Sequence, residues 1–486
     1  MTVSLRALLP RVDLPDIAVT GIALDSRRVE PGQVFIALQG NAHDGRCFIK
    51  NAVTAGACAV LCDSASAQEG IGVPVIGVPN LAEEIGKMAS RFYNEPSKHL
   101  TTVAVTGTNG KTSVTYLAAS ALTYLNRSAG IIGTLGKGFL TSLQDSGLTT
   151  PDAVVIQSSL KSMLDAGAKM ALIEASSHGL VQGRLVGTTI HAAVFTNVTR
   201  DHLDYHGNMA SYREAKAKLL QWEGLQCALL NLDDPWLAAL AQAPQVPEVL
   251  GYSQMDAPGA LIRAEALEFQ AAGVQFRLCT PAGCTTVRSA VLGRHNVSNL
   301  LAVAGLLYWY GVELDDMGAA LSNCQPPPGR LQPVPHADRT VLIDFAHTPD
   351  AVAQVLLSLR LHCKNRLICV LGCGGDRDPG KRPLMGDAAV QHSDLCLFTS
   401  DNPRSESPAT IIDDMCRNLA VPLDPANCLT DRKAAIQRAL TLQEPGDVVV
   451  ILGKGHEQYQ EIQGVRYPFN DEAIVTAELI QRGRVS

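Results

Sequence analysis

Short apolar runs, each followed by polar or glycine-rich residues, recur along the chain and predict the buried strands of parallel sheets. The clearest runs are 100–105, 170–173, 192–196, 341–345, 367–371, 395–399 and 448–452. Helical patterns separate them, which is typical of an α/β fold. Because ligands bind at the carboxyl edge of such sheets, the polar residues after each run are the first candidates for a site.

Two polar, proline-containing segments divide the chain. Asn94 to Lys98 includes Pro96 and precedes the run 100–105, and Pro326-Pro327-Pro328-Gly329 precedes the last group of runs. A chain of 486 residues is too long for one ordinary core. We therefore predict three domains, at residues 1–97, 98–326 and 327–486.

Composition excludes several classes of protein. The net charge is −7, from 40 Lys and Arg against 47 Asp and Glu, with no long basic run, so we expect no nucleic-acid partner. Residues 1–10 lack the charged start, apolar middle and small-residue cleavage site of a signal peptide, and no uncharged apolar stretch approaches the roughly 20 residues that span a bilayer, so we expect no membrane insertion. The 13 cysteines are scattered and form no C-x-x-C pair. We expect free thiols in a reducing cytoplasm, with neither a disulfide framework nor a zinc site.

The segment Thr106 to Ser113 follows the run 100–105 and has the pattern of a phosphate-binding loop. Its glycines allow a tight turn, Lys111 supplies a positive charge for phosphates, and the Thr112 hydroxyl can reach Mg²⁺. A helix predicted over 113–125 would point its N-terminal dipole at the phosphates. The general pattern has a further glycine where this chain has Val105. A Gly-Lys-Thr arising by chance in a surface turn is the alternative, which the flanking strand and helix disfavour.

Two further strand ends carry polar residues. Glu174 closes the run 170–173, and the segment 197–207 follows the next run and contains His202 and His206. Mg²⁺ prefers oxygen ligands, so Glu174 is a better candidate than His202. A histidine that caps a helix or bonds to backbone is the alternative, but the density of polar residues after a buried strand favours a site.

In all these features the chain resembles the Mur ligases, the ATP-dependent amide-forming enzymes of bacterial peptidoglycan precursor synthesis. Ten motifs carry the resemblance in order, and chance could hardly produce them together. They are 24–28, 106–112, 149–151, 176–180 with Gln182 and Arg184, 197–207, 293–296, Asp344 with 346–349, 374–378, 401–404 and 453–457. Ala175 and Phe345 depart from the family pattern, where valine and often tyrosine are expected, but neither changes a reacting group.

The resemblance implies a UDP-substrate-binding domain, a central ATP-binding P-loop domain and a Rossmann-like C-terminal domain that binds the incoming amino acid. The implied activity is ATP-dependent addition of meso-2,6-diaminopimelate to UDP-N-acetylmuramoyl-L-alanyl-D-glutamate, with Mg²⁺ as cofactor. An acyl phosphate forms on the way, and ADP and phosphate are released. Such an enzyme serves cell-wall biogenesis, cell shape and cell division in the cytoplasm. We expect a monomer whose partners are these small molecules.

The family motifs assign the site residues position by position. The implied catalytic residues are Lys111, Glu174, His202 and Lys216; the implied metal ligands are Thr112, Glu174, His202 and Lys216 as a carbamate. The implied ATP contacts are Gly107, Thr108, Asn109, Gly110, Lys111, Thr112, Ser113, Asn296, Arg330 and Asp344. The implied UDP-substrate contacts are Leu24, Ser26, Asn41, Ala42, His43, Thr149, Thr150, Ser176, Gln182 and Arg184. The implied diaminopimelate contacts are Arg377, Asp401, Asn402, Pro403, Arg404, Gly453 and Glu457.

Two of these assignments depend on the resemblance. Lys216 matches a lysine that many Mur ligases carry as a carbamate formed with CO₂; by itself it reads as a solvated helix lysine, as Lys218 does. Since only the neutral amine reacts with CO₂, burial that lowers the lysine pKa would favour the modification. Arg404 would hold the distal carboxylate of diaminopimelate with two hydrogen bonds. Its alternative is an ordinary loop arginine paired with a surface carboxylate such as Glu406.

Three other functions fit part of the sequence. Folylpolyglutamate synthetase shares the ATP loop and the chemistry but has no use for a UDP-binding segment. A P-loop phosphotransferase would donate to a hydroxyl and would not require a carboxylate acceptor. A nucleotide-gated binding protein would need neither Lys216 nor three substrate pockets.

Overall fold

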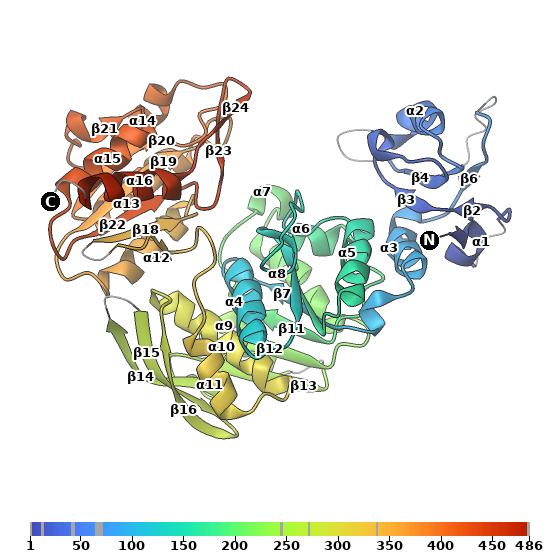
Figure 1. The fold of residues 1–486 in the computed structure, drawn as a ribbon, viewed down its shortest axis with the longest axis horizontal. Helices are drawn as coiled ribbons and strands as arrows, with labels where there is room; N and C mark the ends of the chain where they lie inside the picture. Colours follow the sequence, from blue (N-terminus) through green and yellow to red (C-terminus); the bar gives the residue numbers. More distant parts are fainter. Residues whose placement is uncertain are drawn as a thin grey trace. The chain divides into compact units, whose positions relative to one another are not determined.

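The computed structural model describes residues 2–10, 14–39, 44–63, 71–243, 246–270, 273–336 and 339–483. Helices and strands alternate in it, as the hydrophobic pattern predicts (Figure 1). The chain divides into two compact units. The first comprises Met1–Ser253, Ala257–Leu261 and Gly305–Gly311; the second comprises Gln254–Asp256, Ile262–Ala304 and Val312–Ser486. The predicted domain boundaries near residues 97 and 326 stay predictions.

The first unit begins with a small parallel sheet in the order β3-β4-β5-β6. Its strands are β3 (Gly21–Ala23), β4 (Gln33–Ala37), β5 (Ala59–Cys62) and β6 (Val75–Gly77). The accompanying elements are α1 (Leu5–Leu8), α2 (Ile49–Thr54), α3 (Leu81–Phe92) and the antiparallel pair β1 (Val3–Ser4) and β2 (Ala18–Val19). Leu24 and Ser26 directly follow β3, so they lie at the carboxyl edge of this sheet.

The phosphate-binding loop belongs to a larger sheet in the same unit, in the order β13-β12-β11-β7-β10-β8-β9. The strands are β7 (Thr101–Thr106), β8 (Ala129–Gly133), β9 (Gly136–Gly138), β10 (Met170–Glu174), β11 (Ala192–Phe195), β12 (Cys227–Asn231) and β13 (Glu248–Ser253). All pair in parallel except β9. The carboxyl ends of β7, β10 and β11 therefore bring Gly107, Glu174 and Thr196 to one edge.

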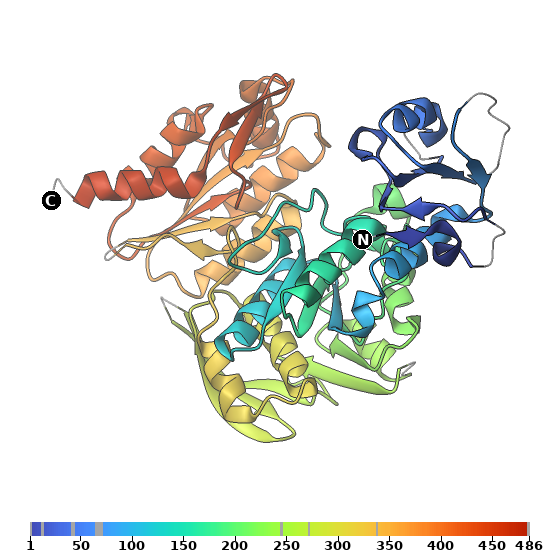
Figure 2. The same cartoon turned by 45° about the vertical axis from the view of Figure 1, so that its right-hand side comes forward.

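Six helices accompany this sheet, namely α4 (Lys111–Tyr124), α5 (Ala153–Asp165), α6 (Ser177–Val181), α7 (Leu203–His206), α8 (Met209–Ala217) and α9 (Pro235–Ala241). Helix α4 lies along β7, β8 and β10, and Figure 2 shows it against the strands from a second side. It begins at Lys111, two residues before the predicted start. Gly110, in a left-handed conformation at φ +87°, is its N-cap and allows the early start.

Helix α3 packs against the turn at Val186 and Gly187 through backbone atoms, with no side chain between them. Gly86 lies on the buried face of α3, where a Cβ atom would overlap the carbonyl of Val186. Gly187 approaches Gly86 from the other side, and a Cβ there would overlap the Gly86 carbonyl. The contact therefore requires glycine at both positions.

The second unit holds an antiparallel sheet of β14 (Ile262–Gln270), β15 (Gly273–Thr280) and β16 (Gly283–Ser289), followed by α10 (Arg294–Trp309) and α11 (Leu314–Ser322). The last turn of α10 belongs to the first unit. A six-stranded sheet follows in the order β17-β18-β22-β19-β20-β21, and all its strands except β17 pair in parallel. These strands are β17 (Gln332–Pro333), β18 (Thr340–Asp344), β19 (Leu367–Cys373), β20 (Leu395–Ser400), β21 (Cys428–Leu429) and β22 (Val448–Leu452).

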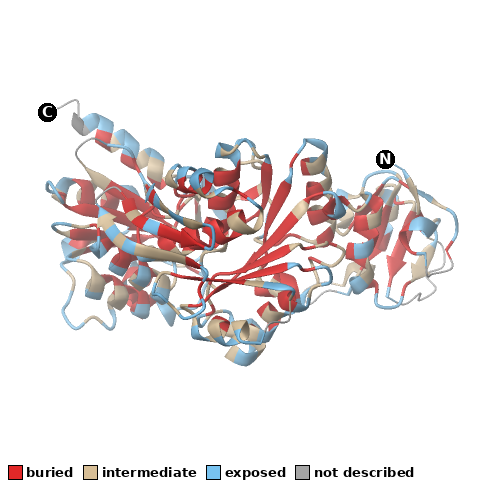
Figure 3. Cartoon of the chain, turned by 90° about the horizontal axis from the view of Figure 1, so that it is seen from below, coloured by how far each residue is buried: buried red, intermediate tan, exposed pale blue. Residues whose placement is uncertain are grey.

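Helices cover both faces of the six-stranded sheet, as in a Rossmann-like fold. Leu342 of β18 packs in one core cluster with α12 (Pro349–Arg360), α13 (Lys381–His392) and α14 (Pro408–Cys416). Its neighbours Val341 and Ile343 point to the opposite face and pack with α15 (Arg432–Leu442) and α16 (Asp471–Gly483). Figure 3 shows that the strands are largely buried. The hairpin β23 (Tyr459–Ile462) and β24 (Val465–Pro468) completes the unit.

The expectation of free cysteines is wrong at one place. Cys279 and Cys284 face each other across the β15–β16 ladder and form a disulfide, because the antiparallel register brings the two side chains together. The other 11 cysteines form no disulfide in the described part of the chain. The described part of the chain contains no group of three or more His, Cys, Asp or Glu residues that could hold a metal ion. No described helix is both long and apolar enough to cross a membrane.

Candidate active site

The loop between β7 and α4 is held by residues that follow β11. Thr108 and Asn109 donate their backbone N–H groups to the carbonyl and the side-chain oxygen of Asn197, at 2.8 and 2.9 Å. Gly107 has φ +152°, and a side chain there would collide with the Thr196 hydroxyl. The Lys111 ammonium donates to the carbonyls of Gly107 and Thr108 at 2.9 and 2.8 Å. These hydrogen bonds fix the shape of the loop, and the Lys111 ammonium lies against the loop backbone.

Glu174 lies at the centre of a cluster of oxygen atoms at the end of β10. Its Oε2 accepts from the Thr112 hydroxyl at 2.9 Å and from the Thr134 hydroxyl at 3.2 Å, and its Oε1 accepts from the Thr134 N–H at 2.8 Å. The side chain is 1% exposed. A buried carboxylate beside the phosphate loop, with hydroxyl oxygens around it, supplies oxygen donors of the kind that Mg²⁺ prefers.

Lys216 is buried beside the same loop, so the interpretation as a solvated helix lysine is wrong. It lies on α8, is 1% exposed, and donates from Nζ to the Gly107 carbonyl at 2.8 Å. Its ammonium also lies 4.6 Å from the centre of the Tyr212 ring. Burial lowers the pKa of Lys216 well below its ordinary value, and the nearby Lys111 charge lowers it further. The neutral amine that CO₂ requires is therefore favoured here.

His202 belongs to a cluster of rings next to Lys216. It is the N-cap of α7, in a left-handed conformation at φ +51°, and its side chain makes no capping bond. The rings of His178 and His202 are 4.8 Å apart, and His206 lies 5.2 Å from Tyr212 and shares a 2.9 Å hydrogen bond with the Ser177 hydroxyl. Burial lowers the pKa of His202, which the Asp201 carboxylate opposes. The lowered pKa favours the neutral ring, which is the form that can bind a metal ion.

The predicted UDP-substrate contacts after β8 and β10 form one hydrogen-bonded group. The Thr150 hydroxyl donates to the Ser176 hydroxyl at 2.9 Å and to the Glu174 carbonyl at 2.7 Å. Arg184 donates to the Thr150 carbonyl at 2.5 Å and to the side-chain oxygen of Gln182 at 2.6 and 3.0 Å. Thr149 joins the Glu174 cluster through Thr134, with 3.1 Å between the hydroxyls. These five residues thus adjoin the phosphate-loop site.

Two of the remaining UDP-substrate predictions, Leu24 and Ser26, directly follow β3 of the small sheet. Leu24 and Ser26 are half-buried, and Asp25 between them caps a short 3-10 helix by accepting from the Arg27 N–H. The Arg27 guanidinium lowers the pKa of Asp25 to about 2. Asp25 therefore serves as a cap, while Ser26 is available at the sheet edge. Asn41, Ala42 and His43 lie outside the described residues.

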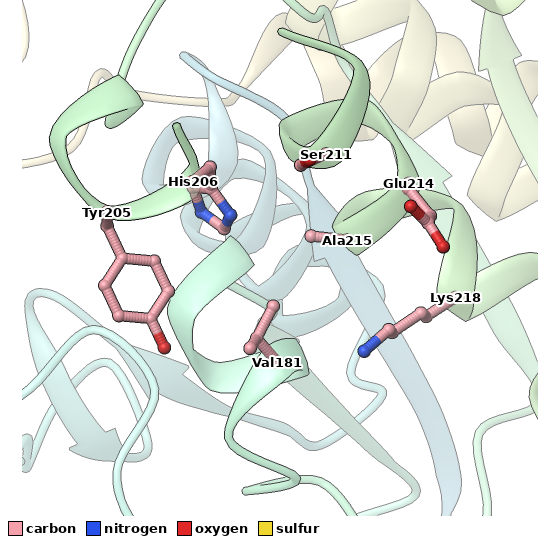
Figure 4. A pocket seen from close by; sticks show the side chains of 7 residues that line it. All are labelled: Val181, Tyr205, His206, Ser211, Glu214, Ala215 and Lys218. Carbon is pink, nitrogen blue, oxygen red and sulfur yellow. The ribbon is translucent and has the colours of Figure 1, made fainter. Parts of the chain in front are cut away.

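A pocket of about 370 Å³ lies beside α8 (Figure 4). Its lining residues are Val181, Tyr205, His206, Ser211, Glu214, Ala215 and Lys218. The members from α8 and the turn after it recur at helical spacing on one face, whereas Lys216 points to the phosphate loop. The Tyr205 hydroxyl accepts a 3.4 Å bond from Gln182, so the pocket borders the predicted substrate contacts.

In the second unit, Asp344 and Arg330 lie together. The Asp344 carboxylate, which is buried, accepts from the backbone N–H groups of Leu331 and Ala346 at 2.7 and 2.8 Å. Burial raises its pKa, and the Arg330 charge opposes the rise. The Arg330 guanidinium lies 5.0 Å from the Phe345 ring centre. The side chain of Asn296, the third predicted contact in this unit, donates to the Leu292 carbonyl and accepts from the Asn299 side chain.

The predicted diaminopimelate contacts gather at the ends of β20 and β22. Asn402 donates to Glu457 at 2.9 Å, and Lys454 donates to both, at 3.0 and 2.8 Å. Asp401 is 8% exposed; burial raises its pKa although Lys454 and Arg432 oppose this. A Cβ on Gly453 would come within 2.6 Å of the Asp401 carboxylate, so glycine is required there.

Arg404 is held in this group by a left-handed backbone at φ +50° just after Pro403. Its guanidinium donates to the Gly375 carbonyl at 2.6 Å and lies 3.9 Å from the Glu461 carboxylate. Glu406 pairs instead with Arg382 at 2.7 Å, so the alternative pairing of Arg404 with Glu406 is wrong. Arg377 is exposed and lies near Gly374, as Arg404 does.

Sequence similarity to another protein establishes the family of this chain. The chain is 46% identical over 477 residues to a protein of Ectopseudomonas mendocina named "UDP-N-acetylmuramoyl-L-alanyl-D-glutamate--2,6-diaminopimelate ligase", and the match covers 97% of each chain. The chain belongs to the Mur ligase family. Family models match it as the Mur ligase family catalytic domain over residues 18–93, the Mur ligase middle domain over 105–307, and the glutamate ligase domain over 329–455.

Solved structures confirm the predicted Mur ligase architecture. A structure carrying the same enzyme name has a TM-score of 0.73 and 37% identity, covering 99% of this chain and 100% of its own. A Mycobacterium tuberculosis folylpolyglutamate synthase in complex with ADP and AMPPCP has a TM-score of 0.62 at 19% identity, covering 81% of this chain and 93% of its own. The second likeness is one of fold alone.

Several residues of this Mur ligase site were not predicted from the sequence. Thr134 holds Glu174, Tyr212 lies beneath Lys216, and Lys454 ties Asn402 to Glu457. Lys454 stands inside a motif that the sequence analysis quoted, so its position was a signal. Thr134 follows a buried strand end at Gly133, which is a weaker signal of the same kind.

Proposed function

We propose that this Mur ligase is a cytoplasmic enzyme that joins meso-2,6-diaminopimelate to UDP-N-acetylmuramoyl-L-alanyl-D-glutamate at the expense of ATP, and that it acts as a monomer. The acceptor carboxylate attacks the γ-phosphorus of ATP, which gives an acyl phosphate and ADP. The amine of the incoming amino acid then attacks the acyl carbon, loses a proton and expels phosphate. The product is the UDP-linked muramoyl tripeptide of peptidoglycan synthesis.

The buried position of Lys216 beside the phosphate loop is the observation that supports this proposal best. A phosphotransferase needs no second buried lysine whose pKa is lowered at the Gly107 carbonyl. In a Mur ligase, such a lysine converted to a carbamate would face the charge that gathers when the acyl phosphate forms. The conversion joins the lysine nitrogen to the carbon of CO₂ and releases one proton.

The chain's own groups would neutralise charge at two places. Lys111 and the loop N–H groups would hold the transferring phosphate, in line with catalysis by positioned charges. Glu174, Thr112, His202 and the Lys216 carbamate would hold Mg²⁺, whose charge would offset that of the phosphates. Arg330 and Asp344 would contact the nucleoside end, and Asn296 is predicted to do so.

An assay of ADP and phosphate release tests the proposal. Release should require the UDP-linked dipeptide together with meso-diaminopimelate, and a new amide should form in equal amount. Release with a folate and glutamate in their place would favour the folylpolyglutamate alternative, and a phosphoester product would favour a phosphotransferase.

A further inference from the structure

One loop in the second unit touches both sets of predicted substrate contacts. The residues Gly453 to Glu457, here called the 453–457 loop, directly follow β22. On one side, the Lys454 ammonium, which is 1% exposed, bonds to Asn402 and Glu457. Since Asn402 and Glu457 are predicted amino-acid contacts, this side of the loop fixes the geometry of that subsite.

The other side of the loop lies against the predicted nucleotide contacts. A Cβ on Gly455, whose φ is +52°, would come within 2.7 Å of the Phe345 Cβ and 3.0 Å of the Gly329 carbonyl. The centres of the His456 and Phe345 rings are 5.4 Å apart. The Arg330 guanidinium lies 5.0 Å from the centre of the same Phe345 ring. The Gly453 N–H donates to the Asp344 carbonyl at 3.1 Å. Backbone packing therefore joins the loop to both Arg330 and Asp344.

Two polar atoms on this side are buried without partners among the described residues. They are Nε of Arg330 and Nδ1 of His456, on the two side chains that contact the Phe345 ring. Leaving such an atom unpaired lowers the stability of the folded chain. Because two buried unpaired atoms lower stability, stability alone does not explain this loop, and a functional role does.

We propose that the 453–457 loop couples the two subsites, and that Gly455 and His456 are positioning residues that link nucleotide binding at Arg330 and Asp344 to amino-acid binding at Asn402 and Glu457. The inference rests on the proposed function, which places those ligands there. A nucleotide that orders the Phe345 side of so short a loop also orders its Lys454 side, so the amino acid loses less conformational freedom on binding. The coupling must be reciprocal.

Calorimetry with a non-hydrolysable ATP analogue and meso-diaminopimelate tests the inference on the full chain. In the unaltered enzyme, each ligand should tighten the binding of the other by about fivefold or more. An amino acid that binds only when the analogue is present is the limiting case of this result. In His456→Ala, each ligand alone should bind within about threefold of normal, and the mutual tightening should fall towards onefold.

Glycine substitutions provide the second pair of variants. Gly455→Ala should abolish the tightening, because its methyl group would separate the loop from Phe345. Gly464→Ala is the matched control: Gly464 is also left-handed, at φ +76°, but has no atom within 4 Å of a Cβ. It should keep the tightening in full. If Gly455→Ala fails to fold, His456→Ala decides alone.

The outcomes separate the two proposals. If both ligands bind the unaltered enzyme without tightening each other, or if His456→Ala tightens normally, the coupling inference is wrong while the proposed function stands. If neither ligand binds the unaltered enzyme, both are wrong.

Discussion

Two charged side chains beside the phosphate loop are removed from solvent. Lys216 and Glu174 are each 1% exposed, and each is held by hydrogen bonds to residues of another element. In such sites a charge that meets a changing substrate charge is worth far more than in water. Truncating one of these side chains should therefore affect catalysis more than folding.

Lys111→Ala should reduce the rate of ADP release by at least about 10²–10³-fold, because the lost charge acts where the γ-phosphoryl group moves. The fold should survive, since the two carbonyls that accept hydrogen bonds from the Lys111 ammonium belong to its own loop. Phosphate release and circular dichroism measure the two effects. Lys87→Ala, which removes an exposed lysine paired with Glu84, should change neither. Near-normal turnover in a folded Lys111→Ala enzyme would show that Lys111 is not a catalytic residue.

Lys216→Ala should be nearly inactive, and a short carboxylate or high bicarbonate should restore part of the activity by supplying the missing anion. Lys161→Ala, on α5, is the control and should respond to neither addition. Initial rates across a series of carboxylate concentrations measure the rescue. Full activity of the alanine variant without any addition would show that the carbamate is not required.

Selectivity between amino acids should depend on Arg404. Lysine lacks the distal carboxylate of diaminopimelate and would leave the guanidinium without that partner, at a cost of roughly 1–3 kcal/mol or more. We expect a strong preference for meso-diaminopimelate over lysine. In Arg404→Ala this preference should be largely lost, because the variant uses diaminopimelate less well. The ratio of kcat/KM for the two amino acids measures the preference. Arg417→Ala, at an exposed arginine, should keep the preference, and equal efficiency of the unaltered enzyme with both substrates would contradict the assignment.

At the scale of elements, the hydrophobic runs located the strands well. The runs 170–173 and 448–452 became β10 (Met170–Glu174) and β22 (Val448–Leu452). Buried parallel strands are continuous apolar segments, so their ends can be read from the sequence. The partners that cross between elements could not be read, since the Cys279–Cys284 pair depends on hairpin register and the Thr134–Glu174 bond on strands far apart in sequence. Motifs predicted the site residues, but they did not predict the hydrogen bonds that hold those residues in place.

Helices α10 and α12 are joined by a histidine whose protonation should weaken the second unit. His295 shares a 3.1 Å hydrogen bond with Ser358, and burial together with Arg330 lowers its pKa to about 4. Above pH 6.5 both folded and unfolded chains hold it neutral. As the pH falls from 6.5 towards 4, only the unfolded chain gains the proton, so stability is lost in that window.

Between pH 7 and pH 5, the unaltered enzyme should therefore lose on the order of 2 kcal/mol more unfolding free energy than His295→Asn. Denaturant unfolding of both proteins at the two pH values measures the difference. Other histidines with lowered pKa, such as His362, remain in both proteins and cancel in the comparison. Equal losses would mean that His295 titrates normally in the folded chain.

At the scale of the whole molecule, the sequence indicated the order of functions along the chain better than the packing of its parts. Three family models match successive segments, and the motifs appeared in the same succession. The first unit nevertheless includes both the small N-terminal sheet and the phosphate-loop sheet. Compactness depends on contacts distant in sequence, such as that between Gly86 and Gly187, which no local pattern announces.

That glycine contact limits how the molecule can be recombined with its relatives. A chimera that takes residues 1–97 from a homologue imports a new α3, and any side chain at position 86 would meet the backbone turn at Val186 and Gly187. The turn at Val186 and Gly187 lies beyond the crossover, outside the transplanted segment. Successful exchanges should therefore be confined to donors with glycine at position 86, whatever their overall identity. Soluble yield across a donor panel, sorted by that single position, would reveal the restriction.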